Sequence, residues 1–179
     1  MMKRKILTSI SLILILIGIT GCKDMMNTPS KRVEEFFNKY QTMDSDVLTD
    51  LDTVIDKSDY LEEEKQEYKD LMKKQYQNLS YKIKDEQTNG NQATVTAEIE
   101  VFDYQTAKIK ADKYIEQHQD ELKDEKEKEA YRLKQMKATT EKVNYTIEFH
   151  LVKDNKTWVL EEITDTDLQK IHGLYTTVD

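Results

Sequence analysis

Apolar residues in the first half of the chain recur at intervals of three and four residues, which is the spacing of one face of an α-helix. Thr28-Pro29-Ser30 is typical of a helix start, because proline is tolerated in the first turn. Three apolar stripes follow and predict three helices. Their members are Val33, Phe36, Phe37 and Tyr40 in the first; Val47, Leu48, Leu51, Val54 and Ile55 in the second; and Leu61, Tyr68, Leu71, Met72, Tyr76 and Leu79 in the third.

From residue 81 the period changes to two, which is typical of strands with one buried and one solvated face. Asn89-Gly90 predicts a tight hairpin turn in which both central residues need positive φ. Lys153-Asp154-Asn155-Lys156 predicts a second turn. The residues expected on the buried face are Tyr81, Ile83 and Asp85 before the first turn; Ala93, Val95, Ala97, Ile99 and Val101 after it; and Val143, Tyr145, Ile147, Phe149 and Leu151 before the second.

Between the two hairpins lies a segment, residues 105–142, that is rich in lysine and glutamate and has no glycine or proline. Its apolar residues recur on one helical face, so it predicts one long helix or a helical hairpin, held on one side and solvated on the other. A last helical turn ends at Gly173, which suits a C-terminal cap. The order predicts an α+β fold, with N-terminal helices packed on a curved four-stranded antiparallel sheet and a charged helical insertion between the hairpins.

The N-terminus has the pattern of a secretory signal: basic residues at positions 3–5, then an apolar run from Ile6 to Ile19. Ile19-Thr20-Gly21-Cys22 resembles the lipobox of bacterial lipoproteins. The resemblance implies a diacylglyceryl group on the Cys22 thiol, cleavage before it, and attachment to the extracytoplasmic face of the cell membrane. Two acyl chains hold a protein on a bilayer stably. The alternative is a plain signal peptide followed by a free cysteine.

This pattern divides the chain into a lipoprotein signal peptide (1–21), a lipid-anchored tether (22–29) and a single domain (30–179). Removing the signal peptide and its three basic residues leaves 24 basic against 35 acidic residues, a net charge of −11. Such a charge is repelled by nucleic acid, so we exclude nucleic-acid binding. Cys22 is the one cysteine, so the mature domain has no disulfide.

Five stretches together resemble the cystatin-like, nuclear-transport-factor-2-like cone found in many small lipoproteins of Gram-positive bacteria. They are "VEEFFNKY", "DLMKKQYQNLSYKI", "NGNQATVTAEIEVFDY", "VNYTIEFHLVKDNKTWVLEEI" and "DLQKIHGLY". The resemblance covers most of residues 30–175 and implies a fold and an address rather than a reaction. The insertion at 105–142 departs from the plain cone.

Enzymes of this cone fold, such as ketosteroid isomerase, place a carboxylate and tyrosine donors in an apolar cavity. The resemblance therefore implies candidate cavity-lining residues, which are Tyr68, Tyr76, Tyr81, Asp85 and Tyr145. Buried tyrosines also commonly fill a core while their hydroxyls find a partner at its edge. The three histidines are not spaced as a ligand pair, and the acidic residues of the second helix lack the glycine of a calcium loop. We expect no metal and no cofactor.

The function expected from these observations is a non-enzymatic, lipid-anchored interaction module of the bacterial envelope. Its partner would be an envelope protein or a wall-associated ligand, and the 105–142 insertion is predicted to carry the contact. The alternative is a small-molecule-binding protein or an enzyme that uses the apolar cavity of the cone. A filled cone favours the first hypothesis, and an open pocket that contains Asp85 favours the second.

Overall fold

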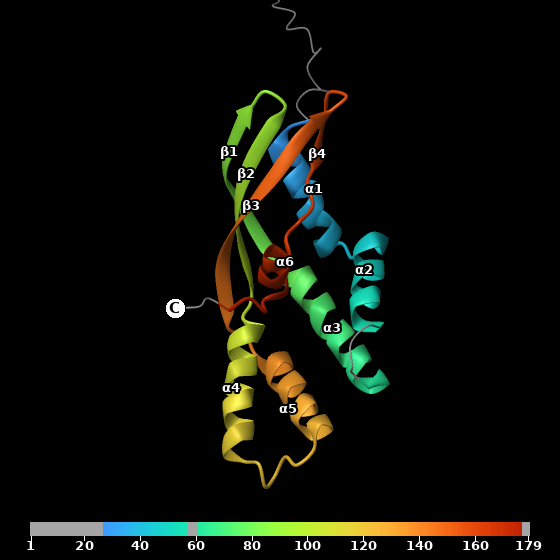
Figure 1. Ribbon diagram of the computed structural model, residues 1–179, viewed down its shortest axis with the longest axis vertical. Coiled ribbons are helices and arrows are strands. Elements are labelled where there is room, and N and C mark those ends of the chain that lie inside the picture. The colour runs from blue at the N-terminus through green and yellow to red at the C-terminus, as the bar shows by residue number, and fades with distance from the viewer. Residues whose placement is uncertain (1–26, 57–60, 177–179) are drawn as a thin grey trace, which may run out of the picture.

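The computed structural model describes residues 27–56 and 61–176, and the predicted signal peptide and Cys22 lie outside the described residues. The described part contains six helices and one four-stranded sheet (Figure 1). This confirms the predicted α+β class. In chain order the elements are α1 (Pro29–Gln41), α2 (Ser45–Asp56), α3 (Glu62–Asn78), β1 (Ser80–Asn89), β2 (Gln92–Phe102), α4 (Tyr104–Gln117), α5 (Glu125–Ala138), β3 (Lys142–Asp154), β4 (Thr157–Leu160) and α6 (Asp165–His172).

The sheet is antiparallel throughout, and its strands are hydrogen-bonded in the order β1-β2-β3-β4. Val95 lies opposite Phe149, and Ala97 lies opposite Ile147, so the apolar residues of β2 and β3 share one face as predicted. The helix α1 covers this face (Figure 1). Phe37 of α1 packs edge-on against Phe149 at 5.3 Å between ring centroids and stacks on Tyr81 at 4.5 Å.

The first strand departs from the predicted alternation at a β-bulge. Ile83 pairs with Ala97, but Asp85 pairs with Thr96, so one extra residue stands between them. A bulge shifts every later side chain of its strand to the other face. Asp85 was expected on the buried face, and the register instead puts it on the solvated face. Glu86 takes the inner position and accepts hydrogen bonds from the backbone N–H (2.9 Å) and the hydroxyl of Ser30 in the first turn of α1.

The two hairpin turns differ in type. Asn89 still pairs with Gln92, so the first turn has Gly90 and Asn91 at its centre, and only Gly90 has positive φ (62°). This fits a type II′ turn rather than the predicted pair of positive φ angles. The second turn has Asn155 and Lys156 at its centre, with φ of 46° and 71°, which is the type I′ pattern.

A buried glutamine joins the lower end of the sheet to the helices. Gln75 of α3 is fully buried, and its amide accepts a hydrogen bond from the Phe102 N–H (2.9 Å) and donates one to the Phe102 carbonyl (3.0 Å). Gly173, the C-cap of α6, lies directly against the same groups, because a Cβ there would be 2.1 Å from the Phe102 carbonyl oxygen. The Gln75 side-chain amide thus makes the same two hydrogen bonds with the end of β2 that the backbone of a neighbouring strand would make.

The helices α4 and α5 form the predicted insertion as a helical hairpin, which extends from the lower end of the sheet (Figure 1). Ala107, Ala111 and Ile115 of α4 are buried, and so are Leu133 and Met136 of α5. The apolar stripe is therefore the buried side of the two helices, and Ala107, Leu133 and Met136 belong to the main hydrophobic core. Within residues 27–56 and 61–176, no helix is long and apolar enough to cross a membrane.

Candidate functional site

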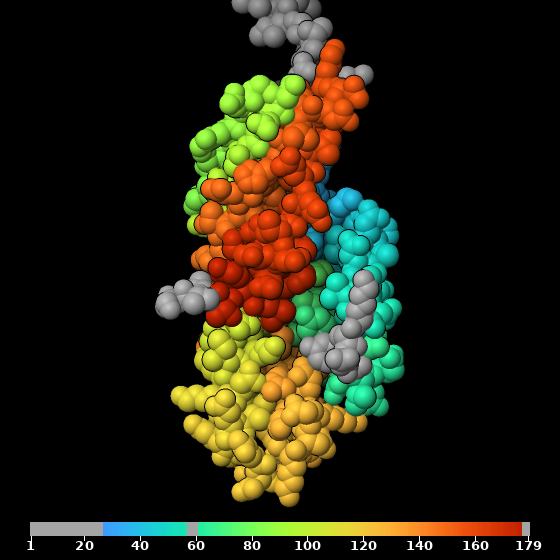
Figure 2. Space-filling view, viewed as in Figure 1, coloured from blue at the N-terminus to red at the C-terminus, as the bar shows by residue number. Residues whose placement is uncertain are grey.

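A groove of about 300 Å³ opens between α1, α2, α3 and α6. Its floor is apolar, because buried residues of α2 and α3 such as Leu51 and Met72 face it. Figure 2 shows α3 (green) between α6 (dark red) and α2 (cyan). The lining residues are Tyr40, Val47, Asp50, Leu51, Thr53, Val54, Tyr68, Met72, Tyr76, Leu168 and His172. Volume and lining match the low end of small-molecule sites, which run from about 300 to 1,000 Å³.

A tyrosine–histidine pair lies at one wall of this groove. The Tyr76 hydroxyl and His172 Nε2 are 3.0 Å apart, and the rings are tilted against each other at 5.7 Å. Burial lowers the pKa of His172 to about 4, and burial also raises the pKa of Tyr76. The imidazole is therefore neutral near pH 7, and one of the two groups donates while the other accepts. A histidine with this pKa is a weak base at neutral pH, so the pair suits hydrogen bonding to a ligand better than proton transfer.

The aromatic wall continues through two more tyrosines. Tyr40 meets Tyr76 edge to face, with ring centroids 4.9 Å apart and planes at 89°. Burial raises the pKa of Tyr40 to about 12, and the charge of Asp50 on the rim adds to this shift. Burial likewise raises the pKa of Tyr68 to about 12. All three phenols therefore remain protonated at neutral pH and keep their hydrogen-bonding capacity.

The structure brings together two of the five residues predicted to line a cavity, Tyr68 and Tyr76. Tyr81 stacks on Phe37 instead, and the Tyr145 hydroxyl donates to the Tyr175 carbonyl (3.1 Å). Asp85 is exposed and accepts a hydrogen bond from the Gln87 amide (2.9 Å).

The space between α1 and the sheet, where a cone would have its cavity, is occupied by aromatic rings. Phe36, Phe37 and Phe149 contact one another, with all three centroid distances between 5.3 and 5.4 Å. The groove lies among the helices instead. Sequence reasoning missed Tyr40 and His172 as groove residues. Tyr40 was correctly assigned to an apolar stripe, but no sequence signal shows that its helix, α1, leaves part of that stripe open toward α6.

The hairpin of α4 and α5 offers a second candidate surface. On one side Tyr114 stacks between Tyr131 (4.9 Å) and His118 (3.8 Å), and all three rings are partly exposed. On the other side Arg132 of α5 bonds Asp112 of α4 at 2.6 Å and Glu129 of its own helix at 3.0 Å. The contacts on both sides fix how the two helices lie against each other.

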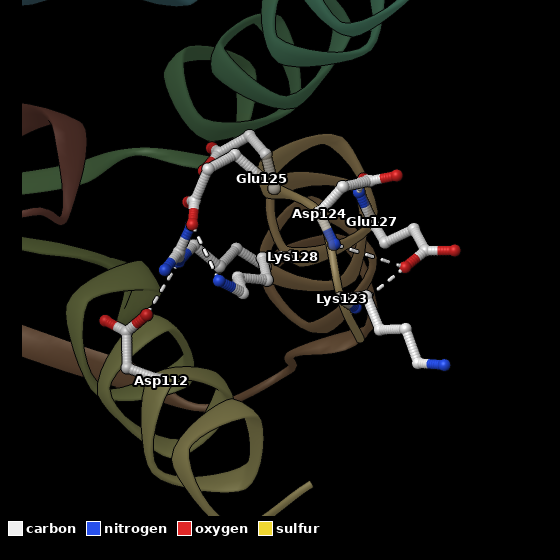
Figure 3. A network of polar contacts seen from close by, with 8 residues as sticks. Asp112, Lys123, Asp124, Glu125, Glu127 and Lys128 are labelled. Carbon is white, nitrogen blue, oxygen red and sulfur yellow. Dashed lines mark hydrogen bonds and ion pairs between the residues drawn. The ribbon is translucent and has the colours of Figure 1, made fainter. Parts of the chain in front are cut away.

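The loop at the tip of this hairpin is held by a reciprocal cap (Figure 3). The Asp124 carboxylate accepts from the Glu127 N–H at 2.8 Å, and the Glu127 carboxylate accepts from the Asp124 N–H at 3.5 Å and from the Lys123 N–H at 2.9 Å. Such a capping box satisfies donors that a helix start leaves unpaired. Close to this defined turn, the side chains of Glu116, Asp120 and Lys123 are exposed.

The other candidate residues lie apart from one another. His150 is on the solvated face of the sheet, 3.3 Å from the Thr94 hydroxyl, while His118 belongs to the aromatic stack of the hairpin. Among the described residues, no group of three His, Cys, Asp or Glu side chains is placed to hold a metal ion. Cys22, the predicted lipidation site, is outside them.

Comparison with known proteins adds no relative: the chain matches no protein-family model, no curated protein and no solved structure. The resemblance to lipoproteins with a cystatin-like cone therefore stays a prediction from the sequence.

Proposed function

We propose that this chain is a lipid-anchored interaction module on the extracytoplasmic face of a bacterial cell membrane, and that it acts without catalysis. The observation that carries the proposal is the Ile19-Thr20-Gly21-Cys22 pattern. The position of Asn27, the first described residue, indicates where such an anchor would be attached. Its amide donates to the Lys156 carbonyl (2.6 Å) and accepts from the Trp158 N–H (3.3 Å), both at the β3–β4 turn. Cys22 is five residues earlier, so a lipid-modified Cys22 would have its backbone at most about 17 Å from Asn27.

The helical hairpin lies at the opposite end of the molecule from this turn (Figure 1). β3 has 13 residues and spans about 43 Å. The helix α4 has 14 residues and adds about 21 Å. A protein attached at Cys22 would therefore present the α4–α5 tip about 60 Å from its anchored end.

The hairpin also has a surface suited to a partner. Tyrosine is enriched among residues that dominate binding energies, because its ring gives a large contact area at little cost in entropy. Tyr114 and Tyr131 are partly exposed and held in a stack, so they are already ordered before any partner binds. The partner we propose is an envelope protein or a wall-associated ligand.

Anchoring is tested by Cys22→Ser and metabolic labelling with a fatty-acid analogue. The parent is expected to incorporate the label and to fractionate with membranes, whereas the variant incorporates none. Equal labelling of both proteins would disprove the lipid anchor without bearing on the hairpin.

The contact surface is tested by crosslinking on intact cells with Glu116→Lys, Asp120→Lys and Lys123→Glu combined. Glu121 is left unchanged because the Tyr114 hydroxyl contacts its carboxylate at 3.5 Å. A matched control combines Glu148→Lys, Asp154→Lys and Lys82→Glu, three exposed charges on the strands that give the same net change. Loss of the crosslinked neighbour in the hairpin variant alone supports the proposal, and its retention at parental yield refutes it.

The second candidate function is small-molecule binding, which the groove between α1, α2, α3 and α6 favours. It differs from the predicted version, because the groove lies among the helices and does not contain Asp85. An enzyme that works by acid–base catalysis would also need a group that moves a proton near neutral pH, and the shifted pKa values of Tyr76 and His172 do not suit that role.

A further inference from the structure

We propose that the groove between α1, α2, α3 and α6 binds a small organic cation, an amine with an apolar or aromatic body. This site is separate from the hairpin surface and from the lipid anchor, so it stands or fails independently of both. The inference rests on the charge of the lining, on the arrangement of its aromatic rings and on its size.

The lining has a single sign of charge. Among the described residues that form the groove, Asp50 is the only one with a charge at neutral pH, and no lysine or arginine takes part. His172 is neutral there, because burial lowers its pKa to about 4. An anionic ligand would meet Asp50 with no compensating cation, whereas an amine would pair with it at the rim.

Three tyrosine side chains line the groove. Tyr40 and Tyr76 stand at 89° to each other with centroids 4.9 Å apart, and Tyr68 lines the same groove. A cation is attracted to the negative face of an aromatic ring, and sites for substituted ammonium groups are commonly built from several such rings. Tyrosines on the walls and Asp50 at the mouth therefore favour the same charge.

The apolar floor of the groove favours an apolar body for the part of the ligand that does not carry the charge. Leu51 and Met72 are almost fully buried, and Val54 is 60% exposed at the edge. An apolar body of the ligand would lie on this floor and cover Val54, which favours binding in proportion to the apolar area removed from water. A volume of about 300 Å³ admits a small molecule but not a folded protein segment.

The test uses three probes with the same phenyl body: 2-phenylethylammonium, 2-phenylethanol and phenylacetate. The full chain, purified in a non-ionic detergent and labelled at its methionine methyl groups, is titrated with each and followed by NMR. The Met72 methyl reports on the groove, and the Met136 methyl, which is buried in α5 and does not line the groove, is an internal reference.

We expect the cation to shift the Met72 signal saturably and to bind at least about fivefold more tightly than the alcohol, with no shift from phenylacetate. Asp50→Asn is expected to lower affinity for the cation to that for the alcohol. Asp56→Asn is the matched control, because Asp56 is exposed on the same helix but does not line the groove, and it is expected to change neither.

Three results would overturn the proposal. One is equal affinity for the cation and the alcohol, which would mean that the groove recognises only the apolar body. Another is an unchanged affinity in Asp50→Asn. The third is a titration in which Met72 does not shift, or shifts only together with Met136. Loss of the hairpin's crosslinked neighbour, tested separately, affects none of these outcomes.

Discussion

Replacing Gln75 by glutamate should make the stability of the protein depend on pH in a way that the parent does not. Gln75 is fully buried, and its amide both accepts from and donates to the backbone of Phe102. A protonated glutamate has the same shape and can make both hydrogen bonds. An ionised glutamate can only accept, so its charge would lie buried against the Phe102 carbonyl oxygen.

The magnitude follows from the cost of keeping that carboxyl protonated. Burial without a cation should raise its pKa in the folded state above 7, from an unfolded value of about 4.3. At pH 7 the variant must then hold a proton that the unfolded chain releases, which costs about 3–4 kcal/mol of the free energy of unfolding. Because the folded pKa is raised, the variant is expected to be about as stable as the parent below pH 4. The loss should grow as the pH rises from there toward 7.

The assay is urea unfolding of parent and variants at several pH values between 4 and 8. Gln77→Glu is the matched control, because Gln77 is exposed on the same helix and its ionisation should shift stability by less than about 1 kcal/mol. Gln75→Leu should lose stability equally at every pH, since it removes both hydrogen bonds and adds no titrating group. If Gln75→Glu is as stable as the parent at pH 7, water reaches this site and the reasoning is wrong.

Three further predictions test other features of the fold. Gly173→Ala should lower the free energy of unfolding by about 2–5 kcal/mol, because φ is +70° and the new Cβ would meet backbone at 2.1 Å. Gly90→Ala, at φ of +62° in open space, should lower it by about 1–2 kcal/mol. Equal losses in urea unfolding would contradict the close packing at Gly173. Lys156→Gly should raise the free energy of unfolding by about 0.5–1 kcal/mol, because glycine adopts φ of 71° without strain, and an unchanged melting curve would count against this. Burial lowers the folded pKa of His172 to about 4 from 6.5, so its contribution to stability is present above pH 6.5 and is lost as the pH falls toward 4. Over that range the parent should lose up to about 3 kcal/mol more of its free energy of unfolding than His172→Gln does, and parallel stability profiles of the two proteins would refute this.

The sequence by itself determined the kinds of element and most of their faces. A period of two along β2 and β3 put Val95 and Phe149 on one buried face, and the register confirms it. The stripe of the 105–142 insertion likewise matches the buried side of α4 and α5. These features are local: the repeat of a strand or a helix is set by its own backbone, so spacing alone reveals which residues share a side.

Only the tertiary structure decided which residues form the groove and which acid faces α1. One extra residue in β1 exchanges Asp85 for Glu86, and a bulge of this kind leaves no trace in the alternation before it. Tyr76 and His172 lie 96 positions apart, and Asn27 reaches Lys156 across 129. Such contacts depend on how whole elements pack. The hydrophobic effect that drives packing is non-directional, so the apolar pattern does not show which partner a polar group will meet.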